Sequence, residues 1–305
     1  MRLVVVADPS PEARERARRI ADVDVTDDAQ EAIDREDVSA VVVCAGTDQH
    51  AALALSAVQA GKHLYLEKPL AAGVADGEQL VAASERAGVI AAIGFNRRYH
   101  PLFARARALV AAGAIGRVVA GQAAFCEPTE PDAMPEWKRR VASGGGVLLD
   151  LATHHVDLVP WLTGRELLAT HARAFSAASE EDSARLHMRL AGDVEVEGFY
   201  SFRAARSDFV ELIGDAGVLR VDRYDGSLRV WVARDGLHAV RRARFRPDRA
   251  TLSWRARRIL RPADEPSYRR SLRAWADAVG GHEGDLPTLR EGLDNLRAIE
   301  GARAA

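Results

Sequence analysis

A carboxylate and an imidazole that could exchange a proton stand four residues apart in the segment GGGVLLDLATHHVDL, residues 144–158. If this segment is helical, Asp150 and His154 share one face, and Asp157 lies near the same face. A carboxylate one turn from an imidazole orients the ring and favours its protonated form, so the pair can move a proton near neutral pH. Oxidation of an alcohol requires that transfer. The alternative is a helix with a solvated acid and a packed histidine.

A lysine that could stabilise negative charge follows an apolar run in the segment AGKHLYLEKPLA, residues 60–71. We predict a strand at 63–66, and open α/β sheets bind ligands at the carboxyl ends of such strands. Pro69 restricts the preceding Lys68 to an extended conformation, so we expect the lysine side chain to project from the strand end. There it could hydrogen-bond a substrate hydroxyl and stabilise charge on its oxygen. A solvated surface lysine is the alternative.

The elements that must position these residues fall into two regions. Over 1–95, continuous apolar runs alternate with helical segments, which is typical of parallel strands covered on both faces. We predict strands at 3–7, 23–26, 40–44, 63–66 and 89–93, with helices at 11–20, 28–35, 50–60 and 75–87. After a helix at 101–112, short alternating runs separated by Gly and Asp predict an antiparallel sheet with helices on one face. Helices at 266–278 and 288–302 close the chain.

At this point the chain resembles the Gfo/Idh/MocA oxidoreductases, which include glucose–fructose oxidoreductase and inositol dehydrogenase. The resemblance is carried by the EKP segment at 67–69, the segment GFNRRYHP at 94–101 and the segment at 144–158, in that order. It implies an α/β plus α+β architecture: a Rossmann-like dinucleotide-binding domain over 1–97, and an open, mainly antiparallel sheet domain for substrate and oligomerisation over 98–305. It also implies NAD(H)-dependent hydride transfer to or from a sugar or cyclitol, in a homodimer or homotetramer.

The same resemblance assigns roles to individual residues. The catalytic set it implies is Lys68, Asp150 and His154. The residues it places at the cofactor are Asp8, Cys44, Thr47, His50, Glu67, Asn96 and Arg97. Those it places at the substrate are Lys68, Arg97, Trp137, Lys138, Asp150 and His154, and it implies no metal. The run Cys44 to Gly46 departs from the family's Ala-Thr-Pro turn, and Asp8 would repel a 2′-phosphate and so favour NAD over NADP.

The resemblance also predicts where the phosphate-binding turn belongs. A G-x-G-x-x-G turn precedes the ribose-binding acid by about 20 residues, which from Asp8 falls before Met1. No such motif occurs in the 305 residues. Three arrangements are open: a start about 30 residues upstream, one βα unit's worth, direct pairing of the strands at 3–7 and 40–44, or a strand from another subunit. For the chain as given, we expect weak or absent nicotinamide binding.

Composition narrows the remaining possibilities. The net charge of −2 gives no general attraction to nucleic acid or anionic membrane, and no apolar run is long enough to span a bilayer. Without a signal-peptide pattern, Cys44 and Cys126 are predicted to be reduced thiols of a cytoplasmic protein. The basic stretch 239–262 is a surface excursion, a loop for a phosphorylated substrate or partner, or a nucleic-acid contact. A cofactor-poor sugar-binding regulatory or assembly subunit, and a redox-neutral lyase or epimerase, remain the alternative functions.

Overall fold

The computed structural model describes residues 1–233, 240–242 and 265–304, so most of the basic stretch 239–262 lies outside the described residues. The chain forms two compact units. The first comprises Met1–Gly94 and Leu272–Leu293, and the second comprises Phe95–Ser271 and Asp294–Ala305. This differs from the predicted domains 1–97 and 98–305, because a late helical segment returns to the N-terminal unit.

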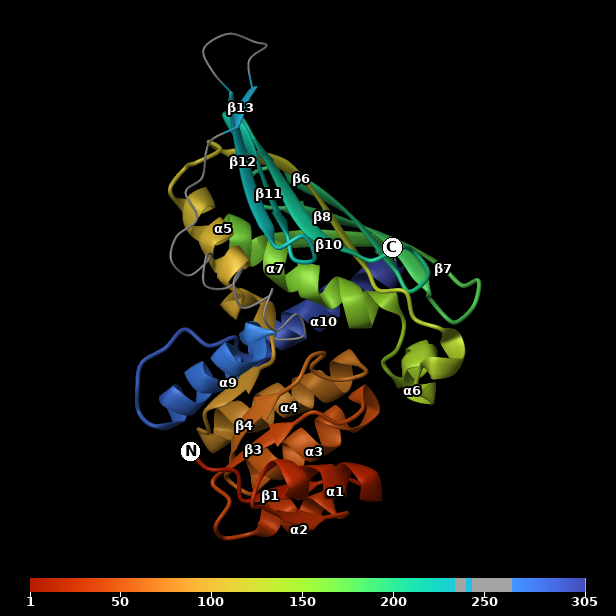
Figure 1. Cartoon of the computed structure of the whole chain (residues 1–305), viewed down its shortest axis with the longest axis vertical. Helices are drawn as coiled ribbons and strands as arrows, with labels where there is room; N and C mark the ends of the chain where they lie inside the picture. The colour runs from red at the N-terminus through yellow and green to blue at the C-terminus, as the bar shows by residue number, and fades with distance from the viewer. Residues whose placement is uncertain (234–239, 243–264, 305) are drawn as a thin grey trace. The chain divides into compact units, whose positions relative to one another are not determined.

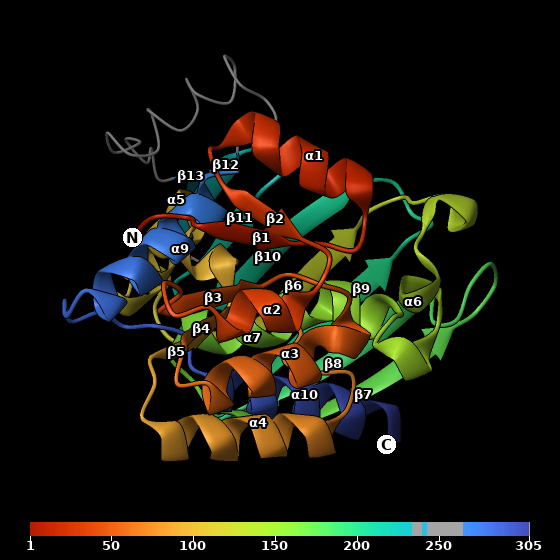
Figure 2. The ribbon, with the colours of Figure 1, turned by 90° about the horizontal axis from the view of Figure 1, so that it is seen from below.

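The centre of the N-terminal unit is a parallel sheet in the order β3-β4-β5, formed by Ala40–Val43, His63–Leu66 and Ala91–Ile93. The helices α3 (Thr47–Gln59) and α4 (Val74–Ala87) follow β3 and β4 (Figure 2). The helix α9 (Pro266–Val279) brings Trp275 against Tyr65 of β4, with ring centroids 5.7 Å apart. Helices therefore cover both faces, which explains the continuous apolar runs of these strands.

The first two strands form a separate parallel pair, β1 (Val5–Ala7) and β2 (Asp24–Thr26), as Figure 2 shows. The helices α1 (Pro11–Ile20) and α2 (Ala29–Asp34) are capped by the side chains of Ser10 and Asp28. Because β1 pairs with β2 and β3 pairs with β4, the direct pairing of the strands at 3–7 and 40–44 is wrong. No residue before Ile33 is buried, so this part of the unit lacks a core of its own.

The second unit is built on a sheet of eight described strands in the order β13-β12-β11-β10-β6-β9-β8-β7. In chain order they are Val118–Cys126, Leu167–Phe175, Ser183–Leu190, Val194–Ser201, Ser207–Gly214, Gly217–Asp222, Ser227–Ala233 and Val240–Arg242 for β6 to β13. All neighbours are antiparallel except β6 and β9. The predicted fold class is confirmed. The strand β7 was not predicted, because its side chains are mostly exposed and its apolar residues do not alternate.

Helices pack on one face of this sheet (Figure 1). They are α5 (Pro101–Ala111), α7 (Thr153–Thr163) and the end of α10 (Leu289–Ala304), with a π-helical turn over Leu148–Ala152 before α7. Short helical turns lie at Asn96–Tyr99, Pro131–Ala133, Glu136–Arg139 (α6) and Val141–Ser143. Within the described part of the chain, no helix combines the length and apolarity needed to cross a membrane.

Candidate active site

The predicted residues of the N-terminal unit lie in the turns that follow β1, β3 and β4. Asp8 follows β1, and its Oδ1 accepts a hydrogen bond from the Ser10 backbone N–H at 2.8 Å. Its own backbone N–H donates to the Thr26 carbonyl at 3.1 Å, so the acid is fixed to both strands of the pair. Asp8 is half buried, which leaves this carboxylate accessible at a strand end.

Cys44 and Glu67 share a neighbourhood at the ends of β3 and β4. Burial raises the pKa of the Cys44 thiol, and the charges of Glu67 and Asp8 raise it further. Burial also raises the pKa of Glu67, while the ammonium of Lys68 opposes that shift. A Cβ at Gly94 would lie 3.0 Å from Glu67 Oε2, so glycine there leaves room for the carboxyl group. The carboxyl group of Glu67 therefore lies close enough to the half-buried Lys68 and to Cys44 to interact with both.

His50 and Thr47 lie on the first turn of α3 and are almost fully buried, at 2% and 3% exposed. Both ring nitrogens of His50 face backbone carbonyl oxygens, those of Pro69 and Ala45. Burial lowers the pKa of His50, against the opposing effect of these two carbonyls. The structure therefore directs the imidazole at the backbone, which does not support the predicted cofactor contact of His50.

In the second unit, Lys138 and Asp150 form an ion pair, with Nζ and Oδ2 2.6 Å apart. The Lys138 ammonium also lies 5.3 Å from the centre of the Phe202 ring. The glycine turn before the π-helical segment makes this pair possible. A Cβ at Gly145 would lie 2.4 Å from the Lys138 carbonyl oxygen, so only glycine lets the two segments approach. The predicted substrate residue Trp137 precedes Lys138 on α6 and is half buried.

The predicted single helix carrying Asp150 and His154 is instead a π-helical turn followed by α7. Asp150 lies in the π turn, where hydrogen bonds close five residues back, and such turns occur often at functional sites. His154 is half buried on the first turn of α7, with its ring 5.9 Å from the Phe125 ring. The ion pair of Asp150 with Lys138 is the interaction that spacing alone did not predict.

Asn96 and Arg97, which are predicted to face the cofactor and substrate, are buried. Arg97 is 5% exposed and pairs with Asp208 at 2.8 Å. Asn96 donates to Ser267 Oγ at 3.1 Å. Arg223 also binds Asp208, from the segment after β11. All of these contacts lie within the second unit, and the roles of Asn96 and Arg97 at the cofactor and substrate stay predictions.

Asp208 is the centre of a buried ionic cluster that sequence reasoning missed. Burial alone would raise the pKa of Asp208, but the charges of Arg97 and Arg223, and a hydrogen bond from His155, hold it well below its usual range. His155 is fully buried, and its Nε2 lies 3.3 Å from Asp208 Oδ1. The sequence offered no signal for the cluster, because Arg97 and His155 lie 111 and 53 residues from Asp208 along the chain, and the pairing with Arg223 crosses from one strand to the end of the next.

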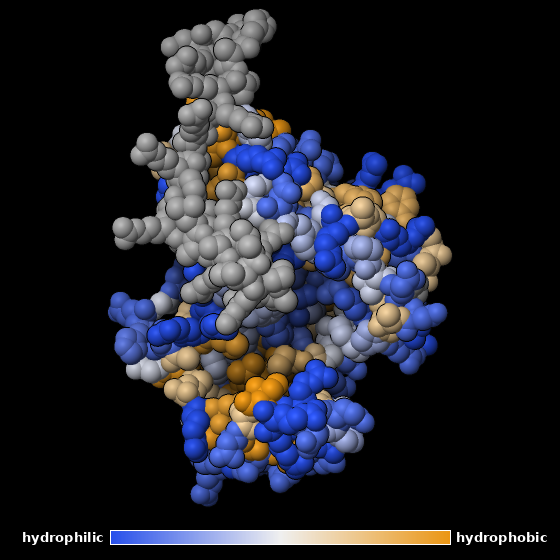
Figure 3. All heavy atoms as spheres, in the orientation of Figure 1, coloured by the Kyte–Doolittle hydropathy of each residue, from blue (hydrophilic) through white to orange (hydrophobic). Residues whose placement is uncertain are grey.

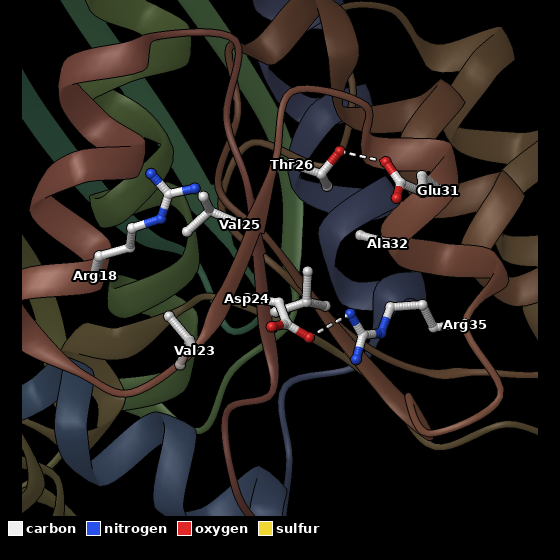
Figure 4. A pocket seen from close by; sticks show the side chains of 9 residues that line it. Arg18, Val23, Asp24, Val25, Thr26, Glu31, Ala32 and Arg35 are labelled. Carbon is white, nitrogen blue, oxygen red and sulfur yellow. Dashed lines mark hydrogen bonds and ion pairs between the residues drawn. The ribbon is translucent and has the colours of Figure 1, made fainter.

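A cavity of about 340 Å³ lies beside β2 (Figure 4). Its lining includes Asp24, which pairs with Arg35, and Thr26, which donates to Glu31. None of the predicted site residues lines it. Among the described residues, no group of three His, Cys, Asp or Glu side chains is arranged to hold a metal ion.

Two family models match the chain. Residues 1–95 match the oxidoreductase family, NAD-binding Rossmann fold, and residues 103–220 match the GFO/IDH/MocA C-terminal domain. The chain belongs to the Gfo/Idh/MocA oxidoreductase family. The family assignment made from the three sequence segments is confirmed.

Similar proteins support the assignment. Levoglucosan dehydrogenase of Pseudarthrobacter phenanthrenivorans is 32% identical over 52% of this chain and 42% of its own length. Myo-inositol 2-dehydrogenase of Thermotoga maritima is 32% identical over 55% of this chain and 47% of its own length. The chain thus spans about half the length of these curated relatives. The crystal structure of an oxidoreductase domain protein from Kribbella flavida covers 98% of this chain and 87% of its own, with 25% identity and a TM-score of 0.83.

Proposed function

We propose that this Gfo/Idh/MocA protein is an NAD(H)-dependent oxidoreductase that interconverts a hydroxyl and a ketone on a sugar or cyclitol. The observation that carries the proposal is the ion pair of Lys138 and Asp150, one π turn before His154, in a chain whose first 95 residues match an NAD-binding family model. The names of the relatives, levoglucosan and myo-inositol dehydrogenases, support a polyhydroxylated substrate.

Each of the predicted catalytic residues would have its own role in this reaction. The ammonium of Lys68 binds the substrate hydroxyl and stabilises charge on its oxygen. His154 accepts the hydroxyl proton as the carbon is oxidised. Asp150, paired with Lys138, orients the imidazole, and Trp137, next to Lys138 on α6, contacts the substrate. NAD⁺, when bound, supplies the acceptor for the hydride that leaves the carbon.

The described residues fit this cofactor in part. Asp8 offers a carboxylate at the end of β1, the position from which an acid binds the adenosine ribose hydroxyls. The turn from Cys44 to Thr47 follows β3, and Glu67 follows β4. The G-x-G-x-x-G turn that holds a pyrophosphate is not among the 305 residues. Asp8, Cys44, Thr47 and Glu67 are therefore the residues proposed for the cofactor.

A turnover assay tests the proposal. The purified chain is incubated with NAD⁺ and a panel of cyclitols and anhydro sugars, and NADH formation is followed by absorbance. We expect His154→Ala to lower kcat by about 10²–10⁴-fold with NADH affinity retained. The matched control is His282→Ala, because His282 is exposed in a loop and lies outside the proposed site. Equal rates in both variants would overturn the role of His154.

The cofactor-poor and redox-neutral alternatives make different predictions for the same assay. A sugar-binding regulatory or assembly subunit would bind a polyol without NADH formation. A redox-neutral lyase or epimerase would convert the polyol without net change in NAD⁺. The same incubations, with products identified by mass spectrometry and NMR, separate these three outcomes.

We also propose that the chain forms a homodimer or homotetramer through the open face of its sheet. Large apolar side chains are exposed on the strands β6, β7 and β9 of this sheet: Val119, Leu168, Phe175 and Phe199. Sedimentation would show a smaller assembly for Phe199→Glu than for the unmodified chain. No nucleic-acid or membrane partner is part of the proposal. We place the reaction in the cytoplasm, where the free thiols of Cys44 and Cys126 stay reduced.

A further inference from the structure

His50 holds two turns of the N-terminal unit together through one buried ring. It is the fourth residue of α3 and is 2% exposed. Its Nδ1 lies 2.7 Å from the carbonyl oxygen of Pro69, and its Nε2 lies 3.1 Å from that of Ala45. Both ends of the imidazole therefore contact backbone.

The two carbonyls belong to neighbouring turns at one edge of the sheet. Ala45 follows β3, and Pro69 follows β4 directly after Lys68. The strands pair in register to their last residues, Val43 opposite Leu66, so both turns leave the sheet at the same edge. The His50 ring thus connects the turn after β3 to the peptide that carries Lys68.

The two contacts of His50 are not equivalent. A neutral imidazole carries one N–H and can donate to only one of the two carbonyls. Burial lowers the pKa of His50, and the charge of Lys68 acts in the same direction, so the ring is neutral at pH 7. We assign the hydrogen to Nδ1, because its distance to the Pro69 oxygen is the shorter one. The bond to Pro69 is then the one the ring donates.

We propose that His50 is a positioning residue for Lys68: its Nδ1–H fixes the carbonyl of Pro69, and with it the peptide from which the Lys68 side chain projects. His50 itself touches neither substrate nor cofactor in this account. The inference rests on the proposed role of Lys68 in binding the substrate hydroxyl. It also gives a function to a histidine on α3 whose ring is hidden from solvent.

Two substitutions separate the contacts of the ring. In His50→Asn the amide nitrogen lies near the position of Nδ1 and can still donate to Pro69, whereas in His50→Gln it lies near the position of Nε2. We expect kcat for polyol oxidation to fall about 100-fold in His50→Ala and His50→Gln, because a misplacement of about 1 Å has an effect of that size. We expect His50→Asn to stay within a few-fold of the unmodified chain, with the KM for NAD⁺ unchanged in all three.

The chain offers a second readout that needs no turnover, because it has only three lysines, Lys62, Lys68 and Lys138. Reductive methylation with ¹³C-formaldehyde places one NMR signal on each, and Lys68→Arg assigns the signal of Lys68. We expect that signal to shift in His50→Ala and His50→Gln and to stay in place in His50→Asn. Lys62, which donates to two carbonyls, and Lys138, which pairs with Asp150, are the internal controls.

The two readouts distinguish the inference from the proposed function. If Lys68→Met is inactive while His50→Gln keeps both the Lys68 signal and the rate, the positioning role of His50 is wrong and the proposed function stands. Rescue by Gln and not by Asn would likewise overturn the positioning role of His50, since the bond to Ala45 would then be the important one.

If Lys68→Met is fully active, the role of Lys68 in the reaction fails, and the NMR comparison alone decides whether His50 positions it. If His50→Ala does not fold, the Asn and Gln pair decides.

Discussion

The β1–β2 sheet and the β3–β5 sheet of the N-terminal unit are built from similar apolar runs but differ in what covers them. Every residue of β1 is partly exposed, whereas β4 has three consecutive buried residues. The three-stranded sheet has α9 packed on Tyr65 and Ala92. Four large apolar side chains of the unit remain exposed, Met1, Leu3, Ile20 and Val42, and Figure 3 shows apolar surface on this unit.

This difference separates the two halves of the proposed chemistry. Lys68 follows the buried strand β4, so its backbone is held by a packed core and by His50. Asp8 follows β1, which pairs only with β2 among the described strands. Because elements with few buried contacts open at low free energy, we expect the proposed cofactor acid to lie on the less stable region and the proposed catalytic lysine on the more stable one.

The largest expected effect on stability comes from removing a side chain of α9 that packs on the three-stranded sheet. Trp275→Ala takes away a ring that is 2% exposed and packs on Tyr65, and we expect a loss of about 3–5 kcal/mol in unfolding free energy. Hydrogen exchange should show β4 amides losing protection toward the level of β1. Unchanged protection of β4 would mean that α9 does not stabilise this sheet.

A matched pair of truncations compares the two sheets directly. Leu66→Ala in β4 removes a fully buried side chain and should cost about 2–5 kcal/mol, whereas Val5→Ala in β1 should cost about 1 kcal/mol or less. Chemical denaturation of both variants measures the difference. Equal costs would contradict the account of β1–β2 as a sheet without a core.

A smaller effect concerns cofactor choice at the end of β1. Asp8→Ser removes the charge that would repel a 2′-phosphate, so the ratio of NADPH to NADH affinity should rise by about tenfold, or about 1.4 kcal/mol. Calorimetric titration with both nucleotides measures the ratio, with Asp48→Ser on α3 as the control acid. An unchanged ratio would remove Asp8 from the cofactor site.

The smallest effect is the pH dependence that Glu67 adds at the end of β4. Because burial raises the pKa of this carboxyl group in the folded chain, its contribution to stability is present below its unfolded pKa and is lost as pH rises through the folded value. Glu67→Gln should therefore raise the melting temperature at pH 7 and leave it unchanged at pH 4. A lower melting temperature at pH 7 would show that Glu67 is stabilised as a carboxylate.

Much of the scaffold was readable from local pattern. The helix at 11–20 and the strand at 63–66 match α1 and β4 in both bounds, because a capping serine with Pro11 and a run of apolar residues act locally. The pattern of apolar residues did not show that the side chains of β1 stay partly exposed, because burial depends on which elements pack against a strand.

The site was predicted less completely, for reasons of long-range packing. Arg97 looked like a loop residue near the ligand, yet it pairs with Asp208 from a strand 111 residues away. The helical spacing of Asp150 and His154 assumed an α-helix, and the π turn with its Lys138 partner depends on how Gly145 meets the loop before it. The direct backbone contacts of His50 likewise arise only when β3 and β4 pair.

A calorimetric titration of the 305-residue chain with NADH tests whether Asp8 on β1 holds the cofactor. We expect weak but saturable binding that weakens further in Asp8→Ala, with hydrogen exchange of β1 and β2 slowed when NADH is bound. No binding heat at millimolar NADH, or binding that is the same in Asp8→Ala, would contradict the assignment of this chain as an NAD(H)-dependent oxidoreductase with its cofactor acid on β1.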